Sequence, residues 1–373
     1  MPATVRPTTR PTSSRPEEGT DAPRLDPSPG CRVEPDCRHR RGGSAVNRVR
    51  YFLLRSVQTV VLLWLVLSFI FLLFRLMPGS FADIMLARGA DAESVAQFEE
   101  NWGLNDPLHV QYVNYMTNFV QLDVGTSLQY RVPVLEHVRM RIFNSFILMA
   151  PAITVAYLLG SLIGTITGRM RGSNLEKYGI VPIIFVGSFP AFFTAIVLVI
   201  VFAGWLDVFP TGGMYTPGTA GRDGSWLAPY LTADFAVHYV LPFTAVLLRY
   251  LYLPTLIMRT SVVEVMDQDF LFYHRMTGIS RVTEWLHTTK HASLPVITLY
   301  PVSMTRAIGG LVFIEVVFNW PGMGFALIDG VLSRDFPVVQ FVFFLIAAFV
   351  IIANFAVDVV YGFIDPRVSV DGD

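Results

Sequence analysis

Charged residues and cysteine are scarce in this sequence of 373 residues. Only 15% of the residues are charged and 53% are hydrophobic, whereas about a quarter of the residues in an average soluble domain are charged. The apolar residues come in long blocks, so lipid is the expected solvent for most of the chain. The formal net charge of −1 gives no global field that would draw the protein to nucleic acid.

The cysteines and histidines do not form a metal-binding pattern. Cys31 and Cys37 lie near the N-terminus with His39 close by, which is one ligand short of a structural zinc site. His287 and His291 are spaced i, i+4, but no third ligand is evident, so an interface-packed pair is the expectation. We therefore expect free thiols and no metal bound by this chain.

Motifs for nucleotide or covalent chemistry are also missing. The sequence contains no P-loop, no Gly-x-Ser-x-Gly, no His-Glu-x-x-His and no pair of catalytic carboxylates. The chain is therefore predicted not to be an enzyme. Without a nucleotide site it cannot drive ATP-dependent transport by itself.

The chain divides into a tail and a membrane domain. Residues 1–45 are rich in Pro, Arg, Ser and Gly and are predicted to be disordered, because they cannot bury enough surface to offset their ordering entropy. Residues 46–373 are predicted to be an all-α membrane domain with six transmembrane helices, each able to cross roughly 30 Å of hydrocarbon. These spans are expected at about 57–77, 142–167, 179–206, 235–258, 296–318 and 336–360, with a kink at Pro190 in the third.

The segment 80–141 is predicted to be a small helical subdomain on the outer face. One helix is expected from Asp91 to Glu99, and a second is expected to be capped by Asp106 with Pro107 at its first position.

The basic residues next to the predicted spans indicate the orientation in the membrane. Six spans place both termini on the same side, and the flanking segments on that side carry twelve Lys and Arg residues, whereas those on the other side carry seven. The positive-inside rule therefore predicts that both termini and the loop 262–295 are cytoplasmic.

A glycine repeat marks one face of the second predicted span. Gly160, Gly164 and Gly168 recur every four residues, which aligns them on a helix. In lipid such a stripe lets another helix come close, so we expect a helix-packing face rather than a surface that meets lipid.

The polar loop 262–295 is patterned like two short helices. Apolar residues recur at helical spacing from Val262 to His274, and Gly278 can adopt the positive φ that ends a helix. Ser280 is a good N-cap for a second helix, which ends before Pro295. The pattern predicts two short helices joined rigidly at the glycine, and the alternative is an amphipathic segment that lies on the membrane surface.

This loop resembles the cytoplasmic coupling loop of ABC importer permeases, in particular the permease subunits of dipeptide and oligopeptide importers. The resemblance runs from about residue 50 to residue 367. It is carried by DF at 269–270, RMTG at 275–278, HASLP at 291–295, FIEVVFNWPGMG at 313–324, RDFPVVQ at 334–340, RLMPG at 75–79, and Tyr361 with DPR at 365–367. In place of the family's usual small and basic residues before the glycine, this chain has Phe272, Tyr273 and His274.

The resemblance implies a permease of the cell membrane that works with separate subunits. These are a second homologous permease, two cytoplasmic ATPases that hold ATP and magnesium, and an extracytoplasmic binding protein. Peptides are the expected cargo, with nickel complexes or oligosaccharides as alternatives. The residues expected to couple this chain to the ATPases are Asp269, Phe272, Tyr273, His274, Arg275, Gly278, Leu294 and Pro295.

Three charged residues inside predicted spans are candidates for the translocation pathway. Arg249 and Arg306 are expected near mid-depth, held by helix carbonyls or the partner permease, or lining the pathway and meeting an anionic group of the cargo. Glu315 is expected near the outer end, at a depth where it could pair with Arg75. A self-sufficient secondary transporter should instead show internal repeats and acidic residues at mid-membrane, and a membrane enzyme should show a nucleophile and a base.

Overall fold

The computed structural model describes residues 43–76, 105–218 and 226–364, with isolated positions between 86 and 103. The predicted tail lies outside these residues except for its last three, which begin the first helix. The helix predicted from Asp91 to Glu99, apart from Glu93, Val95 and Ala96, and the chain beyond residue 364 also lie outside them. Contacts divide the chain into two units, Met1–Val46 and Asn47–Asp373, and all described residues after Val46 belong to the second.

The fold is all-α, as predicted. Five helices of the described chain are long and apolar enough to cross a membrane, and a bent helix pair makes a sixth if it is counted as one span. The five are α1 (Gly43–Leu76), α5 (Val134–Arg169), α8 (Ala233–Met266), α11 (Leu294–Val317) and α13 (Phe336–Ile364).

The third predicted span is broken rather than kinked. α6 (Asn174–Gly187) ends before Pro190, α7 (Ala191–Leu198) begins after it and continues as a π-helical turn (Val199–Trp205), and the two parts are bent by 102°. Proline has no N–H for the helix ladder and disfavours the α conformation at the residue before it. The sequence therefore located the break, but the prediction of one helix over 179–206 was wrong.

Several helix limits also differ from the predicted ones. α5 starts eight residues before the predicted second span, and α8 continues into the polar loop as far as Met266. The N-cap of α4 (Leu108–Val120) is Pro107, so Asp106 does not cap this helix as predicted. The region 320–335 contains α12 (Met323–Leu332), and a 3₁₀ turn covers Ala228–Leu231.

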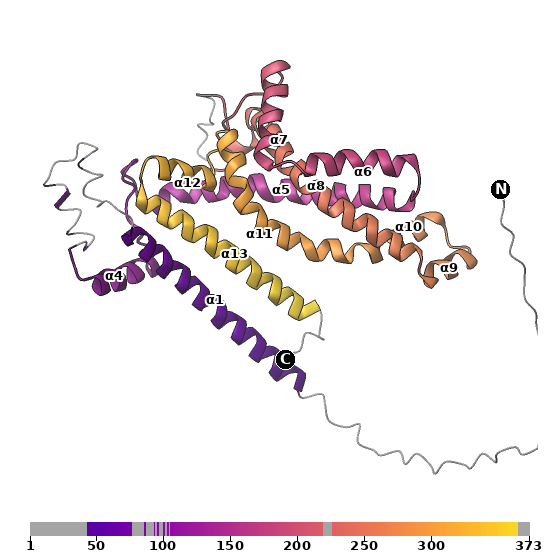
Figure 1. The fold of residues 1–373 in the computed structure, drawn as a ribbon, viewed down its shortest axis with the longest axis horizontal. Coiled ribbons are helices and arrows are strands. Elements are labelled where there is room, and N and C mark those ends of the chain that lie inside the picture. The colour runs from indigo at the N-terminus through magenta and orange to yellow at the C-terminus, as the bar shows by residue number, and fades with distance from the viewer. Residues whose placement is uncertain are drawn as a thin grey trace, which may run out of the picture. The chain divides into compact units, whose positions relative to one another are not determined.

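The short helices lie at the two ends of the spanning helices. α4 and α12 lie at one end, and α9 (Asp269–Met276) and α10 (Arg281–Ala292) lie at the other (Figure 1).

The glycine stripe lies against α8, and the two helices run side by side (Figure 1). A Cβ atom at Gly164 would be 2.6 Å from the carbonyl oxygen of Thr255, and one at Gly168 would be 2.9 Å from that of Arg259. Gly160 meets the ring of Pro254 in the same way, at 2.7 Å. Glycine is therefore required at these positions because the backbone of α8 occupies the space of a side chain.

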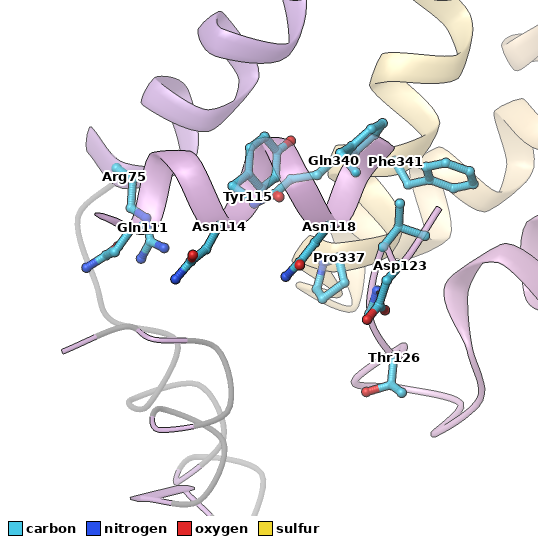
Figure 2. A pocket seen from close by; sticks show the side chains of 13 residues that line it. Arg75, Gln111, Asn114, Tyr115, Asn118, Asp123, Thr126, Pro337, Gln340 and Phe341 are labelled. Carbon is cyan, nitrogen blue, oxygen red and sulfur yellow. The ribbon is translucent and has the colours of Figure 1, made fainter. Parts of the chain in front are cut away.

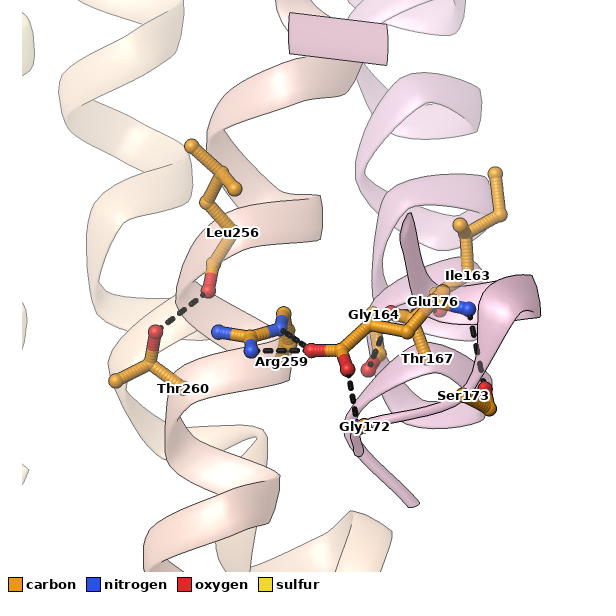
Figure 3. A network of polar contacts seen from close by, with 9 residues as sticks. All are labelled: Ile163, Gly164, Thr167, Gly172, Ser173, Glu176, Leu256, Arg259 and Thr260. Atoms are coloured by element: carbon orange, nitrogen blue, oxygen red, sulfur yellow. Dashed lines mark hydrogen bonds and ion pairs between the residues drawn. The ribbon is translucent and has the colours of Figure 1, made fainter. Parts of the chain in front are cut away.

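An ion pair between α6 and α8 lies beside the α5–α8 contact, at the end nearest the loop 262–295. The carboxylate of Glu176 at the start of α6 accepts hydrogen bonds from Nε of Arg259 at 2.7 Å and from the Gly172 amide at 2.6 Å (Figure 3). Nη2 of Arg259 contacts the same carboxylate. The turn between α5 and α6 is thereby fixed to α8 beside the glycine stripe.

Candidate functional site

The loop 262–295 folds as two short helices with a glycine between them. α9 ends at Met276, and Gly278 has φ +71° with open space where a Cβ would be. Oγ of Ser280 accepts a hydrogen bond from the Thr283 amide at 3.2 Å and caps α10, as predicted. The first helix is not continuous from Val262 to His274 as predicted, because α8 ends at Met266 and α9 begins at Asp269.

One face of the loop packs on itself and on α8. The ring of Phe270 lies 5.0 Å from that of His291, and the ring of His274 lies 5.0 Å from that of His287. Leu271 of α9 is buried in the hydrophobic core, and Phe270 also packs against this core. The two histidines spaced i, i+4 on α10 therefore face α9 and hold the two short helices together.

Ion pairs attach the loop to the turn after α5. Arg169 lies 3.7 Å from Glu284, which is buried in the first turn of α10. The exposed pair Arg171–Asp267 (3.8 Å) joins the turn after α5 to the short connection between α8 and α9. Salt screens the exposed pair, which contributes little to stability, whereas the Arg169–Glu284 pair is largely away from water and is screened less.

The other face of the loop is apolar and exposed. Phe272 is 59% exposed, Tyr273 65% and Met276 73% on α9, and Val282 and Leu286 are exposed on α10. A cluster of large exposed apolar side chains on a rigid element is typical of a protein–protein contact. Two of these residues replace the small and basic residues expected before the glycine.

The remaining predicted loop residues lie around this patch. Asp269 is in the first turn of α9, where an acidic side chain favours a helix N-terminus. Leu294 is 60% exposed and Pro295 is in the first turn of α11. The side chain of Arg275 lies outside the described part of the structure.

Arg249 and Arg306 line one cavity of about 170 Å³ between α7, α8 and α11. The guanidinium of Arg249 lies over the rings of Tyr250 and Tyr252, at 5.8 and 5.6 Å from their centroids. Ser303 and Gly310 of α11 complete the wall that faces these tyrosines. The sequence placed both arginines near mid-depth, but only the structure shows that they share a cavity.

Glu315 lies elsewhere, in a buried polar network. Its carboxylate accepts a hydrogen bond from Oγ of Ser145 at 2.5 Å and another from the amide of Phe325 at 2.9 Å. The side chain is fully buried, and Gly322 approaches it so closely that a Cβ there would overlap the carboxylate. The predicted pair with Arg75 was wrong, because no ion pair joins them within the described residues.

Replacing Glu315 with alanine should destabilise the protein. The Ser145 hydroxyl and the Phe325 amide would lose their acceptor in a buried site, at about 1–3 kcal/mol for each unsatisfied group. We expect a lower melting temperature in detergent, measured by thermal denaturation, and a smaller decrease for Glu315→Gln, which keeps one accepting oxygen. An unchanged melting temperature for the alanine variant would contradict a structural role.

A second buried carboxylate, that of Asp335, gives the motif at 334–340 a structural role. Asp335 is buried and accepts hydrogen bonds from the amides of Leu128 and Gln129, both at 3.1 Å, and from the hydroxyl of Ser127. These donors lie in the turn before α5, more than 200 residues away in sequence. Nothing in the local pattern around Ser127 would have indicated this contact.

A polar cavity of about 190 Å³ lies between α1, α4 and α13 (Figure 2). Arg75 lies at one end and Asp123 at the other, with Asn114 and Asn118 of α4 between them (Figure 2). Arg75 therefore faces a cavity at the α4 end of the molecule and not Glu315.

Taken together, the structure is that of a multi-pass membrane protein with a rigid, partly apolar helical loop at one end and a cavity with two arginines between its spans. Two family models match the chain. One, described as "Binding-protein-dependent transport system inner membrane component", matches residues 156–370, and the other, which describes the N-terminal part of such membrane components, matches residues 48–137.

Curated relatives match over almost their whole length. A Brucella suis protein with a provisional name as a peptide permease is 34% identical over 330 residues. The oligopeptide transport system permease protein AppB of Bacillus subtilis is 30% identical over 323 residues, and the glutathione transport system permease protein GsiC of Salmonella typhimurium is 32% identical over 327. Each match covers 86% of this chain and 99% of the relative.

The chain therefore belongs to the family of inner-membrane components of binding-protein-dependent transport systems, as an ABC permease of the dipeptide and oligopeptide type. It is a transport subunit and not an enzyme. The relatives named here carry peptide names, so nickel complexes, oligosaccharides and stand-alone secondary transport are not favoured.

Proposed function

We propose that this chain forms half of the translocation pathway of an ATP-driven importer of short peptides. The second half would be a similar permease subunit, and the energy would come from two ATPase subunits that bind ATP and magnesium. An extracytoplasmic binding protein would deliver the cargo. The names of the relatives support a peptide cargo, and their near-complete coverage supports the same role for the whole chain.

The observation that carries the coupling role is the exposed apolar face of α9 and α10. Phe272, Tyr273 and Met276 are held outward by the packing of Phe270 and Leu271 on the opposite face. This chain has bulky residues there, so the matching groove of its ATPase would be wider and more apolar than one that receives small and basic residues. No nucleotide or metal would bind to this chain.

The orientation that fits this role has α9, α10 and both termini in the cytoplasm, in a cell membrane. The excess of Lys and Arg in the flanks at that end supports it. α4, α12 and the polar cavity around Arg75 would then face the outside, where the binding protein docks.

Tyr273→Ala tests the coupling surface. An exposed aromatic anchor at the centre of an interface contributes on the order of 2 kcal/mol, so recovery of the ATPase with the affinity-tagged permease should fall strongly. Tyr178, which is 71% exposed on α6, provides the matched control, because Tyr178→Ala removes the same side chain from outside the loop. Equal ATPase recovery in both variants would contradict the proposed contact.

A further inference from the structure

We propose that Arg249 and Arg306 together bind the C-terminal carboxylate of the peptide cargo at the middle of the membrane. This inference rests on the proposed function and adds the chemical group that is recognised and the side chains that recognise it. The cavity between α7, α8 and α11 is the site.

Depth makes both arginines unusual. Arg249 is at the middle of α8 (Ala233–Met266), and Arg306 is at the middle of α11 (Leu294–Val317). A guanidinium at this depth is costly in lipid and is normally found facing protein or a water-filled space. Arg306 is exposed on the surface of this chain and Arg249 is half-buried, so we expect the face that carries them to meet protein or water rather than lipid.

Within the described part of the chain, no carboxylate balances the charge of either arginine. Over residues 43–76, 105–218 and 226–364, no aspartate or glutamate lies within ion-pair distance of either guanidinium. Glu315 is engaged with Ser145 and α12, and Asp358 pairs with Arg55 at 3.1 Å. Two positive charges share one cavity, so an anionic ligand would relieve their mutual repulsion as well as their desolvation.

The surroundings suit a carboxylate at the end of a chain. The rings of Tyr250 and Tyr252 hold the guanidinium of Arg249 from the side, and a planar guanidinium binds a carboxylate through two parallel hydrogen bonds. The cavity of about 170 Å³ is smaller than the 300–1,000 Å³ of typical ligand pockets, so it fits one end of a peptide rather than a whole one. Binding through the terminal carboxylate does not depend on the side chains of the peptide, as a carrier of many different peptides requires.

The test compares transport of tri-alanine with transport of tri-alanine amide by the complete complex in proteoliposomes, with binding protein and ATP. Each variant's rate is divided by the wild-type rate for the same peptide, which removes any preference of the binding protein. Arg306→Gln and Arg249→Gln should lower the rate for free tri-alanine about tenfold, the loss expected when a charge-assisted hydrogen bond is removed, and should leave the amide much less affected. Arg306→Lys should retain part of the rate because it keeps the charge.

Arg139→Gln is the matched control, since Arg139 is exposed near the start of α5 and outside the cavity. Co-purification of all subunits shows that each variant assembles. Equal losses for the two peptides, or no loss in either arginine variant, would overturn the carboxylate site while leaving the permease function intact. Failure of the wild-type complex to transport either peptide would instead overturn the proposed peptide cargo, and with it this inference.

Discussion

Replacing Gly278 with valine should abolish transport while the protein still inserts into the membrane. Gly278 has φ +71°, and a β-branched residue resists this conformation. The strain is of order 1–3 kcal/mol and arises in the backbone, because a Cβ at this position meets nothing within 4 Å. The chain would relieve it by changing the angle between α9 and α10, which would misplace the exposed apolar face.

The measurement is peptide uptake together with ATP hydrolysis stimulated by the binding protein. Both should be lost in Gly278→Val, and both should be retained in Gly278→Asn, since asparagine tolerates the left-handed conformation. Gly218→Val is a second control that should leave both activities intact: Gly218 has φ +93° and open space around it, and it lies before α8 and outside the loop. Stimulated hydrolysis that survives in Gly278→Val would refute the coupling role of the loop.

Gly164→Leu should prevent α5 and α8 from packing and should lower the yield of folded protein sharply. Even the Cβ would be 2.6 Å from the Thr255 carbonyl and 2.7 Å from Cβ of Met258, and the first of these atoms belongs to the helix backbone and cannot rotate away. The two helices would have to separate, which would remove contacts along most of their length. Small residues at such interfaces are what allow close approach in a membrane, where no hydrophobic effect drives helices together.

Size-exclusion chromatography and thermal denaturation in detergent measure this effect. Gly164→Ala should already be damaging, whereas Gly179→Ala on α6 should be tolerated, because a Cβ there lies 3.6 Å from Thr167 in ordinary contact. If Gly164→Leu gave a monodisperse protein with wild-type stability, the close contact between α5 and α8 would not hold in the membrane.

The apolar blocks made the spanning helices predictable from the sequence, because a helix that crosses lipid must be long and predominantly apolar whatever it packs against. The residues at helix ends could also be predicted: Ser280 caps α10 and Gly278 takes a positive φ. The size of the bend at Pro190 could not be predicted from the sequence. Proline marks the position of a break, whereas the angle depends on neighbours such as Tyr252, which meets Gly187 at the end of α6.

Contacts between spans were the least predictable part. Counting residues along a helix gives depth but not the direction in which a side chain points around the bundle. Glu315 and Arg75 were therefore paired wrongly on depth, and the cavity shared by Arg249 and Arg306 was not foreseen. The partners of Asp335 lie more than 200 residues away, and only the tertiary fold brings them together.

The α5–α8 contact has a mechanical consequence. Thirty-four residues of α8 extend for about 50 Å at 1.5 Å per residue, from the start of the helix to the loop, and Pro242 and Pro254 each remove one hydrogen bond from its ladder. The glycines of α5 lie against the backbone of α8, so no side chains between the two helices can be compressed. We therefore expect the two helices to move as one rigid pair rather than to slide past each other. Only Asp267 and Gln268 separate α8 from α9 along the chain, and the packing of α9 on α10 and the Arg169–Glu284 pair give the loop two further connections to α5 and α8. We therefore expect a displacement of α9 to move α5 and α8 together.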